Sequence, residues 1–178
     1  MTMLKGPGLT LRPPHDGDAQ GRLALGNSAE VMRMFGADPG AILPLTLAAS
    51  KAWVDRLAAH PHAWVVEHDG RFLGEIRLND LDRRDRRARL VIGFFDEKRL
   101  GQGLGREAIR LLLAHAFVAL GLHRVSLRVV TYNERAIRCY RACGFKEEGL
   151  ERQSAFVGGQ WHDDVMMGVL AAEFSALS

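Results

Sequence analysis

The sequence lacks any long apolar stretch. No run in its 178 residues approaches the roughly 20 apolar residues that a membrane-spanning helix needs. The first residues, MTMLKGPGLT, also lack the apolar core of about 7–15 residues that a secretory signal peptide carries. We therefore expect neither secretion nor membrane insertion, and a cytoplasmic location. Because this length fits one domain and 47% of the residues are hydrophobic, we expect residues 1–178 to form a single domain.

Lysine is also scarce. Only four lysines are present, so the other twenty cationic side chains are arginines, and the formal net charge is only +3 at pH 7. The densest basic run, Arg83-Arg84-Asp85-Arg86-Arg87, contains its own acid. A nucleic-acid-binding domain usually concentrates its positive charge on one patch. The charge pattern therefore argues against nucleic acid as a partner.

Cysteine occurs only twice, as Cys139 and Cys143. A zinc site needs about four ligands, and no second pair of cysteines or nearby histidines completes one. We therefore expect two small, buried or half-buried thiols in a reducing compartment, and no metal site.

The first third of the chain is predicted to be helical and irregular. A short strand over residues 9–12 ends at Pro13-Pro14. Residues 16–35 are helical with a break at Gly26-Asn27-Ser28, where Ser28 can cap a second helix. A loop over 36–45 and a helix over 46–60 follow.

The middle of the chain changes to strand periodicity. Strands over 63–67 and 72–78 flank Asp69-Gly70, a typical hairpin turn. The run 89–95 is almost continuously apolar, which predicts a strand covered on both faces.

The last part of the chain alternates helices and strands. A long helix ends at Gly121, and its apolar residues recur in steps of three and one from Ile109 to Leu120. A strand over 125–129, a helix over 133–143 and a closing hairpin of 145–156 and 161–170 follow. The order predicts a mixed α/β (α+β) fold whose sheet is mostly antiparallel, with a strand-helix-strand unit at its centre.

Three glycines, Gly101, Gly103 and Gly105, lie between the apolar strand and the long helix. The first N–H groups of a helix are unpaired and carry partial positive charge, and glycines let a phosphate approach them. The turn therefore predicts an anion cradle suited to a pyrophosphate. The Walker motif is absent and the strict dinucleotide fingerprint fails. A relaxed G-x-G-x-x-A reading from Gly103 to Ala108 leaves a dinucleotide-binding oxidoreductase as an alternative, although the predicted antiparallel hairpins argue against it.

Two segments resemble the GNAT superfamily of acetyl-CoA-dependent N-acetyltransferases. Residues 96–108, DEKRLGQGLGREA, are similar to its acyl-CoA loop, with Leu100 where the family motif has Gln or Arg. Residues 133–149, NERAIRCYRACGFKEEG, are similar to its second cofactor motif. The resemblance runs from about Leu9 to Leu170 and is closest to the branch that acetylates ribosomal-protein N-terminal alanines and polyamines. It implies the acyl-CoA N-acyltransferase fold, a mixed, mostly antiparallel twisted sheet with flanking helices, and acetyl transfer from acetyl-CoA to a primary amine.

The resemblance also implies which residues hold acetyl-CoA. The cofactor-binding candidates are Gly93, Phe94, Phe95, Gly101, Gln102, Gly103, Leu104, Gly105, Arg106 and Asn133. Whether Arg99 or Arg106 contacts phosphate stays open. Asn133 and Tyr140 are seven residues apart, about 700° on a helix, so both project from one face. By resemblance, Asn133 binds the cofactor arm and Tyr140 protonates the leaving thiolate; the alternative for Tyr140 is a packing role.

The general base is predicted less directly. Glu75, on the strand before the apolar one, is the candidate, and the alternative is a strand carboxylate paired with Arg77 or Arg89. Members of this branch often have an acid directly after an Arg-Ala pair. This chain has Arg89 after Arg87-Ala88, so the resemblance does not assign the base. Asp163 and Asp164 either face the acceptor or have a structural role in the turn and at the strand end of the last hairpin.

The acceptor stays open among a protein N-terminus, a polyamine and another small amine. A homodimer is plausible by resemblance. The alternative function is a non-catalytic acyl-CoA sensor on the same fold, which would be expected to have lost Tyr140.

Overall fold

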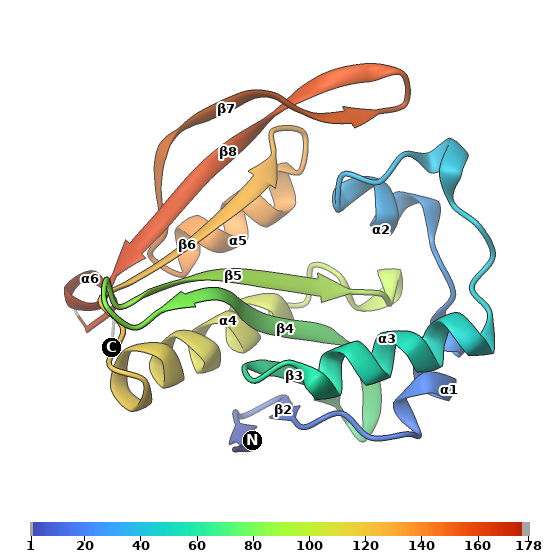
Figure 1. The fold of residues 1–178 in the computed structure, drawn as a ribbon, viewed down its shortest axis with the longest axis horizontal. Helices are drawn as coiled ribbons and strands as arrows, with labels where there is room; N and C mark the ends of the chain where they lie inside the picture. The colour runs from blue at the N-terminus through green and yellow to red at the C-terminus, as the bar shows by residue number, and fades with distance from the viewer. Residues whose placement is uncertain (1, 176–178) are drawn as a thin grey trace.

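The computed structural model describes residues 2–175 and centres on one eight-stranded sheet (Figure 1). The strand order is β1-β2-β3-β4-β5-β6-β8-β7, and only β5 and β6 run parallel. This arrangement confirms the predicted mixed, mostly antiparallel sheet. The strands are β1 (Leu4–Lys5), β2 (Thr10–Arg12), β3 (Ala63–His68), β4 (Arg71–Asp82), β5 (Arg87–Phe94), β6 (Arg124–Val130), β7 (Lys146–Val157) and β8 (Gln160–Leu170).

Helices cover the two faces of the sheet in two groups. The helices are α1 (Asp18–Leu25), α2 (Ala29–Met34), α3 (Leu47–Ala59), α4 (Leu104–Ala114), α5 (Glu134–Ala142) and α6 (Ala171–Ser175), with short 3-10 turns at Pro39–Ala41 and Glu97–Arg99. Buried residues of α4 and α5 join the main core, whereas Leu57 of α3 joins a smaller cluster with β3.

Strand β3 separates these two clusters. Trp64 and Val66 belong to the main core, and Ala63 and Val65 to the cluster beside α3. All four residues are at most 1% exposed. Because successive strand residues point to opposite faces, β3 is covered on both sides.

Strand β5 departs from the prediction that it is covered on both faces. Ala88 and Leu90 are buried in the main core, but Arg87 and Arg89 are exposed on the other face. The helices α1–α3 cover that face near Phe95 and leave it open near Arg89. The apolar run has two causes. One face of β5 packs in the main core, and the last residues of the other face line the cleft described in the next section.

Most local sequence signals have the predicted effect. The hydroxyl of Ser28 caps α2, as predicted, by accepting a hydrogen bond from the Val31 N–H. The hydroxyl of Thr46 caps α3 in the same way, through the Ala49 N–H, a cap that was not predicted from the sequence. The long helix differs near its end, where the α-helical turns widen into a π-helix over His115–Ala119 before Gly121. No sequence signal predicted β1 or α6, which are the shortest strand and a single helical turn. Among the described residues, no helix has the length and apolarity needed to cross a membrane.

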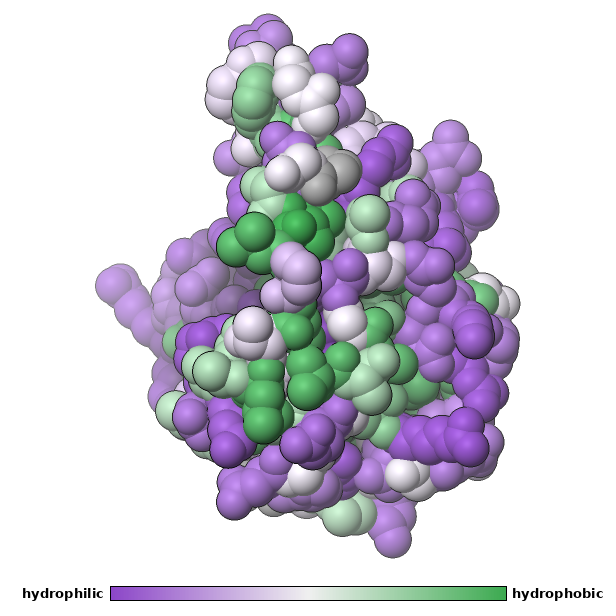
Figure 2. Space-filling view, turned by 90° about the vertical axis from the view of Figure 1, so that its right-hand side faces the viewer, coloured by the Kyte–Doolittle hydropathy of each residue, from purple (hydrophilic) through white to green (hydrophobic). Residues whose placement is uncertain are grey.

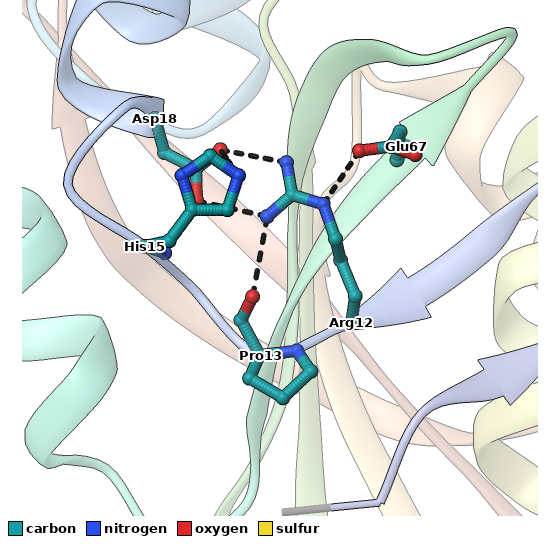
Figure 3. Close-up of polar contacts among 5 residues, drawn as sticks. All are labelled: Arg12, Pro13, His15, Asp18 and Glu67. Atoms are coloured by element: carbon teal, nitrogen blue, oxygen red, sulfur yellow. Dashed lines mark hydrogen bonds and ion pairs between the residues drawn. The ribbon is translucent and has the colours of Figure 1, made fainter.

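A buried ion cluster joins strand β2, helix α1 and strand β3 (Figure 3). The guanidinium of Arg12 donates two hydrogen bonds to Asp18, at 2.7 and 2.9 Å, and one to Glu67 at 2.6 Å. Asp18 also accepts a hydrogen bond from the His15 main-chain N–H at 2.8 Å. Since Asp18 is 2% exposed, its charge depends on these partners. The cluster fixes α1 against β2 and β3.

Candidate active site

The candidate site is a cleft opened by the separation of β5 and β6. The two strands pair only where Arg87–Arg89 meet Arg124–Ser126, although both continue for several residues beyond. Beyond Arg89, that edge of β5 has no strand partner within residues 2–175. The gap between the two strands is a cleft of about 1160 Å³. Residues from α2, α5 and the β7–β8 hairpin also line it.

The glycine turn forms one end of this cleft. Gly101 and Gly103 have φ angles of 78° and 83°, which glycine adopts without the strain of a side chain. Nothing lies within 4 Å of the Cβ position at either glycine. Gly103 is the N-cap of α4 and no side chain caps this helix. The N-terminus of α4 therefore presents its N–H groups in open space, as an anion cradle requires.

Not every residue of the predicted cradle lines the cleft. Gly101, Gly103, Gly105 and Arg106 do, and so does Arg99. Gln102 is exposed and donates a hydrogen bond to the Lys98 carbonyl at 2.8 Å. Leu104 is 7% exposed and packs in the main core. A cofactor role for Leu104 would therefore use its main-chain groups, and the roles of both residues stay predictions.

Two further arginines line this part of the cleft. Arg135 and Arg138 lie on α5, opposite the glycine turn. Sequence reasoning missed both. Their spacing of three residues, which places them on one side of a helix, was the signal that could have found them.

Tyr140 lies on α5 and its half-buried side chain lines the cleft. Its hydroxyl makes no hydrogen bond with any residue of the described chain, and its ring packs edge-on against Phe145 at 6.0 Å. Burial raises the pKa of the Tyr140 phenol, and the neighbouring Cys139 and Cys143 raise it further. Tyr140 is therefore a protonated donor at neutral pH.

Asn133 lines the same cleft but lies outside the helix. It is the N-cap of α5, so the angular argument that treated it as a helical residue was wrong. Its side-chain oxygen accepts a hydrogen bond from the Ala136 N–H at 3.1 Å, and its amide donates one to the Met34 carbonyl at 3.1 Å. The side chain is thus engaged in capping α5 and holding α2.

The end of β5 meets the cleft with its main chain. Gly93 and Phe94 pair with Glu75 and Gly74 of β4, and the Phe95 N–H donates to the Leu73 carbonyl at 2.9 Å. All three predicted residues, Gly93, Phe94 and Phe95, line the cleft. A Cβ at Gly93 would lie 3.0 Å from the Phe35 ring, so glycine allows α2 to pack directly on the strand.

Glu75 lies directly opposite Gly93 and lines the cleft. Its carboxylate forms an ion pair with Arg77 and is only 13% exposed. Of the two alternative partners, Arg77 is the correct one, because Arg89 pairs with Asp80 at 3.6 Å. Arg22 lies near enough for the charge of Glu75 to raise its pKa, although burial lowers the pKa of Arg22 by more.

The two acids of the closing hairpin, Asp163 and Asp164, lie in different surroundings. Asp164 lines the cleft, is 4% exposed and lies 3.8 Å from Arg128. Asp163 instead accepts a hydrogen bond from the Gln153 N–H at 2.7 Å, where β7 bulges. Asp164 alone faces the site.

The two cysteines are free thiols, as predicted. Cys143 is buried and donates to the Arg106 carbonyl at 3.8 Å, whereas Cys139 is half-buried and lines the cleft. Within residues 2–175, no group of three or more histidines, cysteines and acids is arranged to hold a metal ion.

The open end of the cleft is edged by apolar side chains. Figure 2 shows this end of the molecule, where hydrophobic residues gather in a central band between polar flanks, below the projecting hairpin. Phe35, the C-cap of α2, and Phe156 of β7 line the cleft and are 44% and 50% exposed.

Comparisons with known proteins agree with this geometry. The family model of the acetyltransferase (GNAT) domain matches residues 8–146. Spermidine N(1)-acetyltransferase of Escherichia coli (strain K12) is 31% identical over 167 residues, 93% of this chain and 88% of that protein. YdaF of Bacillus subtilis (strain 168), which is provisionally assigned as a ribosomal N-acetyltransferase, is 35% identical over 60% of this chain and 58% of its own length.

The solved structures include a spermidine N-acetyltransferase from Vibrio cholerae in complex with CoA and spermine. It superposes with a TM-score of 0.80 at 25% sequence identity, over 96% of this chain and 99% of that one. The predicted fold and the predicted resemblance are therefore both confirmed. The cleft between β5 and β6, the glycine turn and the matched domain lead to one conclusion: this chain belongs to the GNAT acetyltransferase family.

Proposed function

We propose that this protein transfers an acetyl group from acetyl-CoA to a primary amine by direct attack of the amine on the thioester. The observation that carries the proposal is the cleft itself. Among the described residues, it has a helix N-terminus without a side-chain cap at one end, a strand edge without a partner along one wall, and in the other wall the Tyr140 hydroxyl, which has no hydrogen-bond partner there. These three features match the pyrophosphate, the pantetheine amides and the thioester sulfur of acetyl-CoA.

The cofactor site would use charge and main-chain groups together. The N–H groups at the start of α4 would bind the pyrophosphate, helped by the glycines that leave the approach open. Arg99, Arg106, Arg135 and Arg138 surround the same part of the cleft and would balance the phosphate charges. The free edge of β5 near Gly93 and Phe94 would pair with the pantetheine amides as an added strand does.

Tyr140 would act as the general acid. As the amine bonds to the acetyl carbon, the carbon–sulfur bond breaks and the sulfur leaves with the electron pair. A hydroxyl that is protonated and has no competing partner can donate its proton to that sulfur. The retained Tyr140 favours an enzyme over a non-catalytic acyl-CoA sensor.

Glu75 would receive the proton that the amine loses, directly or through a water. Its position opposite Gly93 supports this role, because it lies beside the proposed path of the thioester. Its ion pair with Arg77 limits the role, since the guanidinium of Arg77 already contacts one of the two carboxylate oxygens. Asp164 is the second carboxylate in the cleft and the alternative base.

The relatives make polyamines the first acceptors to test. The assay follows CoA thiol release from acetyl-CoA with a panel of polyamines, amino acids and peptides. The proposal predicts acetyl-CoA binding by calorimetry and thiol release that depends on an amine. Binding without release for every amine would instead support the sensor, and the absence of binding would refute the cofactor assignment.

A further inference from the structure

The charges of the cleft divide into two groups, and the second group lies away from the proposed cofactor path. Eight arginines and two carboxylates of the described chain line the cleft. Four of the arginines surround the glycine turn and α5. The other four, Arg22, Arg77, Arg89 and Arg128, come from α1 and three neighbouring strands.

The strand register places three of these four arginines on one face of the sheet, near the point where β5 and β6 separate. Arg77 of β4 lies directly opposite Val91 of β5. Arg89 is two residues before Val91 and therefore on the same face. Arg89 pairs with Ser126, and Arg128 lies two residues further along β6 on that face. Arg77 and Arg89 are therefore diagonal neighbours on adjacent strands, with Cα atoms about 7–8 Å apart, whereas Arg128 lies just beyond the last β5–β6 pair, where the two strands separate. All three side chains line the cleft, and together they are called the basic cluster.

This cluster lies beside the proposed reaction centre. Gly93 is two residues beyond Val91 on the same face, a step of about 6.6–6.8 Å. The cluster belongs to the wall that faces the acceptor, whereas the glycine turn lies beyond the far end of β5. An anion bound here would belong to the acceptor and not to the phosphates of CoA.

Arg22 adds a buried positive charge to this wall. It is only 5% exposed, and its guanidinium lies 3.9 Å above the centre of the Phe95 ring. Its hydrogen bonds go to neutral groups, the Gly26 carbonyl and the Asn27 side-chain oxygen. The nearest acid, Glu75, is already paired with Arg77. Two cations therefore share one carboxylate, and a buried excess charge of this kind favours an anionic ligand.

The remaining acids do not cancel the cluster. Asp80 pairs with Arg89 at 3.6 Å and Glu151 with Arg128 at 3.8 Å, but these side chains are 46–69% exposed. Ion pairs this exposed are weak and are readily exchanged for a better partner. Besides Glu75, which pairs with Arg77, Asp164 is the one buried charge among the described residues that opposes the cluster, at 3.8 Å from Arg128.

We propose that the acceptor of this enzyme is an amine that also carries a carboxylate, which Arg77, Arg89 and Arg128 bind, and that polycationic amines are poor acceptors. This inference rests on the proposed function and names its substrate class. The carboxylate could belong to a free amino acid or to an acidic peptide side chain. Both present the same group to the arginines, and guanidinium groups bind carboxylates through paired hydrogen bonds.

The experiment compares matched acceptors by kcat/KM for CoA release. The pairs are L-alanine with L-alaninamide, 5-aminopentanoate with 5-aminopentanamide, and Ala-Glu-Ala-amide with Ala-Gln-Ala-amide, with spermidine as the polycation. At least one carboxylate should exceed its amide by about tenfold or more, because a lost charge-assisted hydrogen bond costs that much. The pair that shows the preference identifies the source of the carboxylate. Spermidine should fall below that carboxylate acceptor.

Arginine variants then locate the preference. R89Q and R128Q should each lower the carboxylate-to-amide ratio toward one, and R84Q, an exposed arginine of the β4–β5 turn, should leave the ratio unchanged. Spermidine equal to or better than every carboxylate acceptor would overturn the inference, and so would a ratio that R89Q and R128Q do not change. Acetyl-CoA binding without acceptance of any carboxylate amine would also overturn it. A failure of acetyl-CoA to bind would instead refute the proposed function.

Discussion

At the scale of single residues, Gly103 carries the proposed phosphate site. Its φ of 83° and the open space around it fit a main-chain anion cradle. We expect G103D to lower acetyl-CoA affinity more than tenfold, because it places a carboxylate where the phosphates would bind. Isothermal titration calorimetry measures this loss.

The control for this variant is G70D in the β3–β4 turn. Gly70 has a φ of 69° and equally open surroundings, but it does not line the cleft. Both substitutions place a side chain on a left-handed residue, so each should lower the free energy of unfolding by the same amount, about 1–2 kcal/mol. Equal acetyl-CoA affinity in G103D and G70D would contradict the cradle.

The protonation of Tyr140 gives a second prediction at this scale. Burial raises the pKa of its phenol above the ordinary value near 10, so the hydroxyl stays a donor below that pH and loses its proton only above it. We expect no fall in kcat between about pH 8 and 10 that depends on this residue. The measurement is the pH profile of kcat for the wild type and Y140F. An alkaline fall with its midpoint below 10 in the wild type, and absent in Y140F, would contradict the raised pKa.

At the scale of elements, α2 is tied across the cleft to the loop before α5. The Tyr132 hydroxyl donates to the Arg33 carbonyl at 2.7 Å, beside the bond from Asn133 to the Met34 carbonyl. Y132F removes the first bond but keeps the ring beneath Arg33. We expect the acceptor KM to rise about two- to tenfold, the value of one hydrogen bond, with unchanged acetyl-CoA affinity. An unchanged acceptor KM would show that this tie does not shape the acceptor site.

The sequence predicted elements well where their signals are local. The cap at Ser28, the Asp69-Gly70 turn and the closing hairpin all lie where the sequence predicts them. The capping position of Asn133 was missed, because a cap and a first helical residue share the same sequence signal. The separation of β5 from β6 was not visible in the residues themselves, since it depends on pairing between segments far apart in the chain. For the same reason, only the register reveals that Arg77 and Arg89 are neighbours and that Arg128 lies on the same face where the cleft opens.

At the scale of the whole molecule, the cleft lies inside the sheet, so a bound cofactor connects its two halves. The β5 half and the β6 half share only a short parallel pairing. A ligand at about 100 times its Kd adds about 2.7 kcal/mol to the free energy of unfolding. For a chain of this size we expect saturating acetyl-CoA to raise the Tm by about 5–10 °C, measured by differential scanning fluorimetry. A Tm that does not change with acetyl-CoA would argue against binding in the cleft.

The central claim, that this cleft transfers an acetyl group with Tyr140 as the acid, is tested most directly by Y140F. The measurement combines kcat for amine-dependent CoA release with acetyl-CoA Kd, in the wild type and in the variant. We expect kcat to fall about a hundredfold or more, as for the loss of a general acid, while the Kd changes little because the ring and its contact with Phe145 remain. An unchanged kcat, or a fall explained entirely by weaker acetyl-CoA binding, would contradict the account.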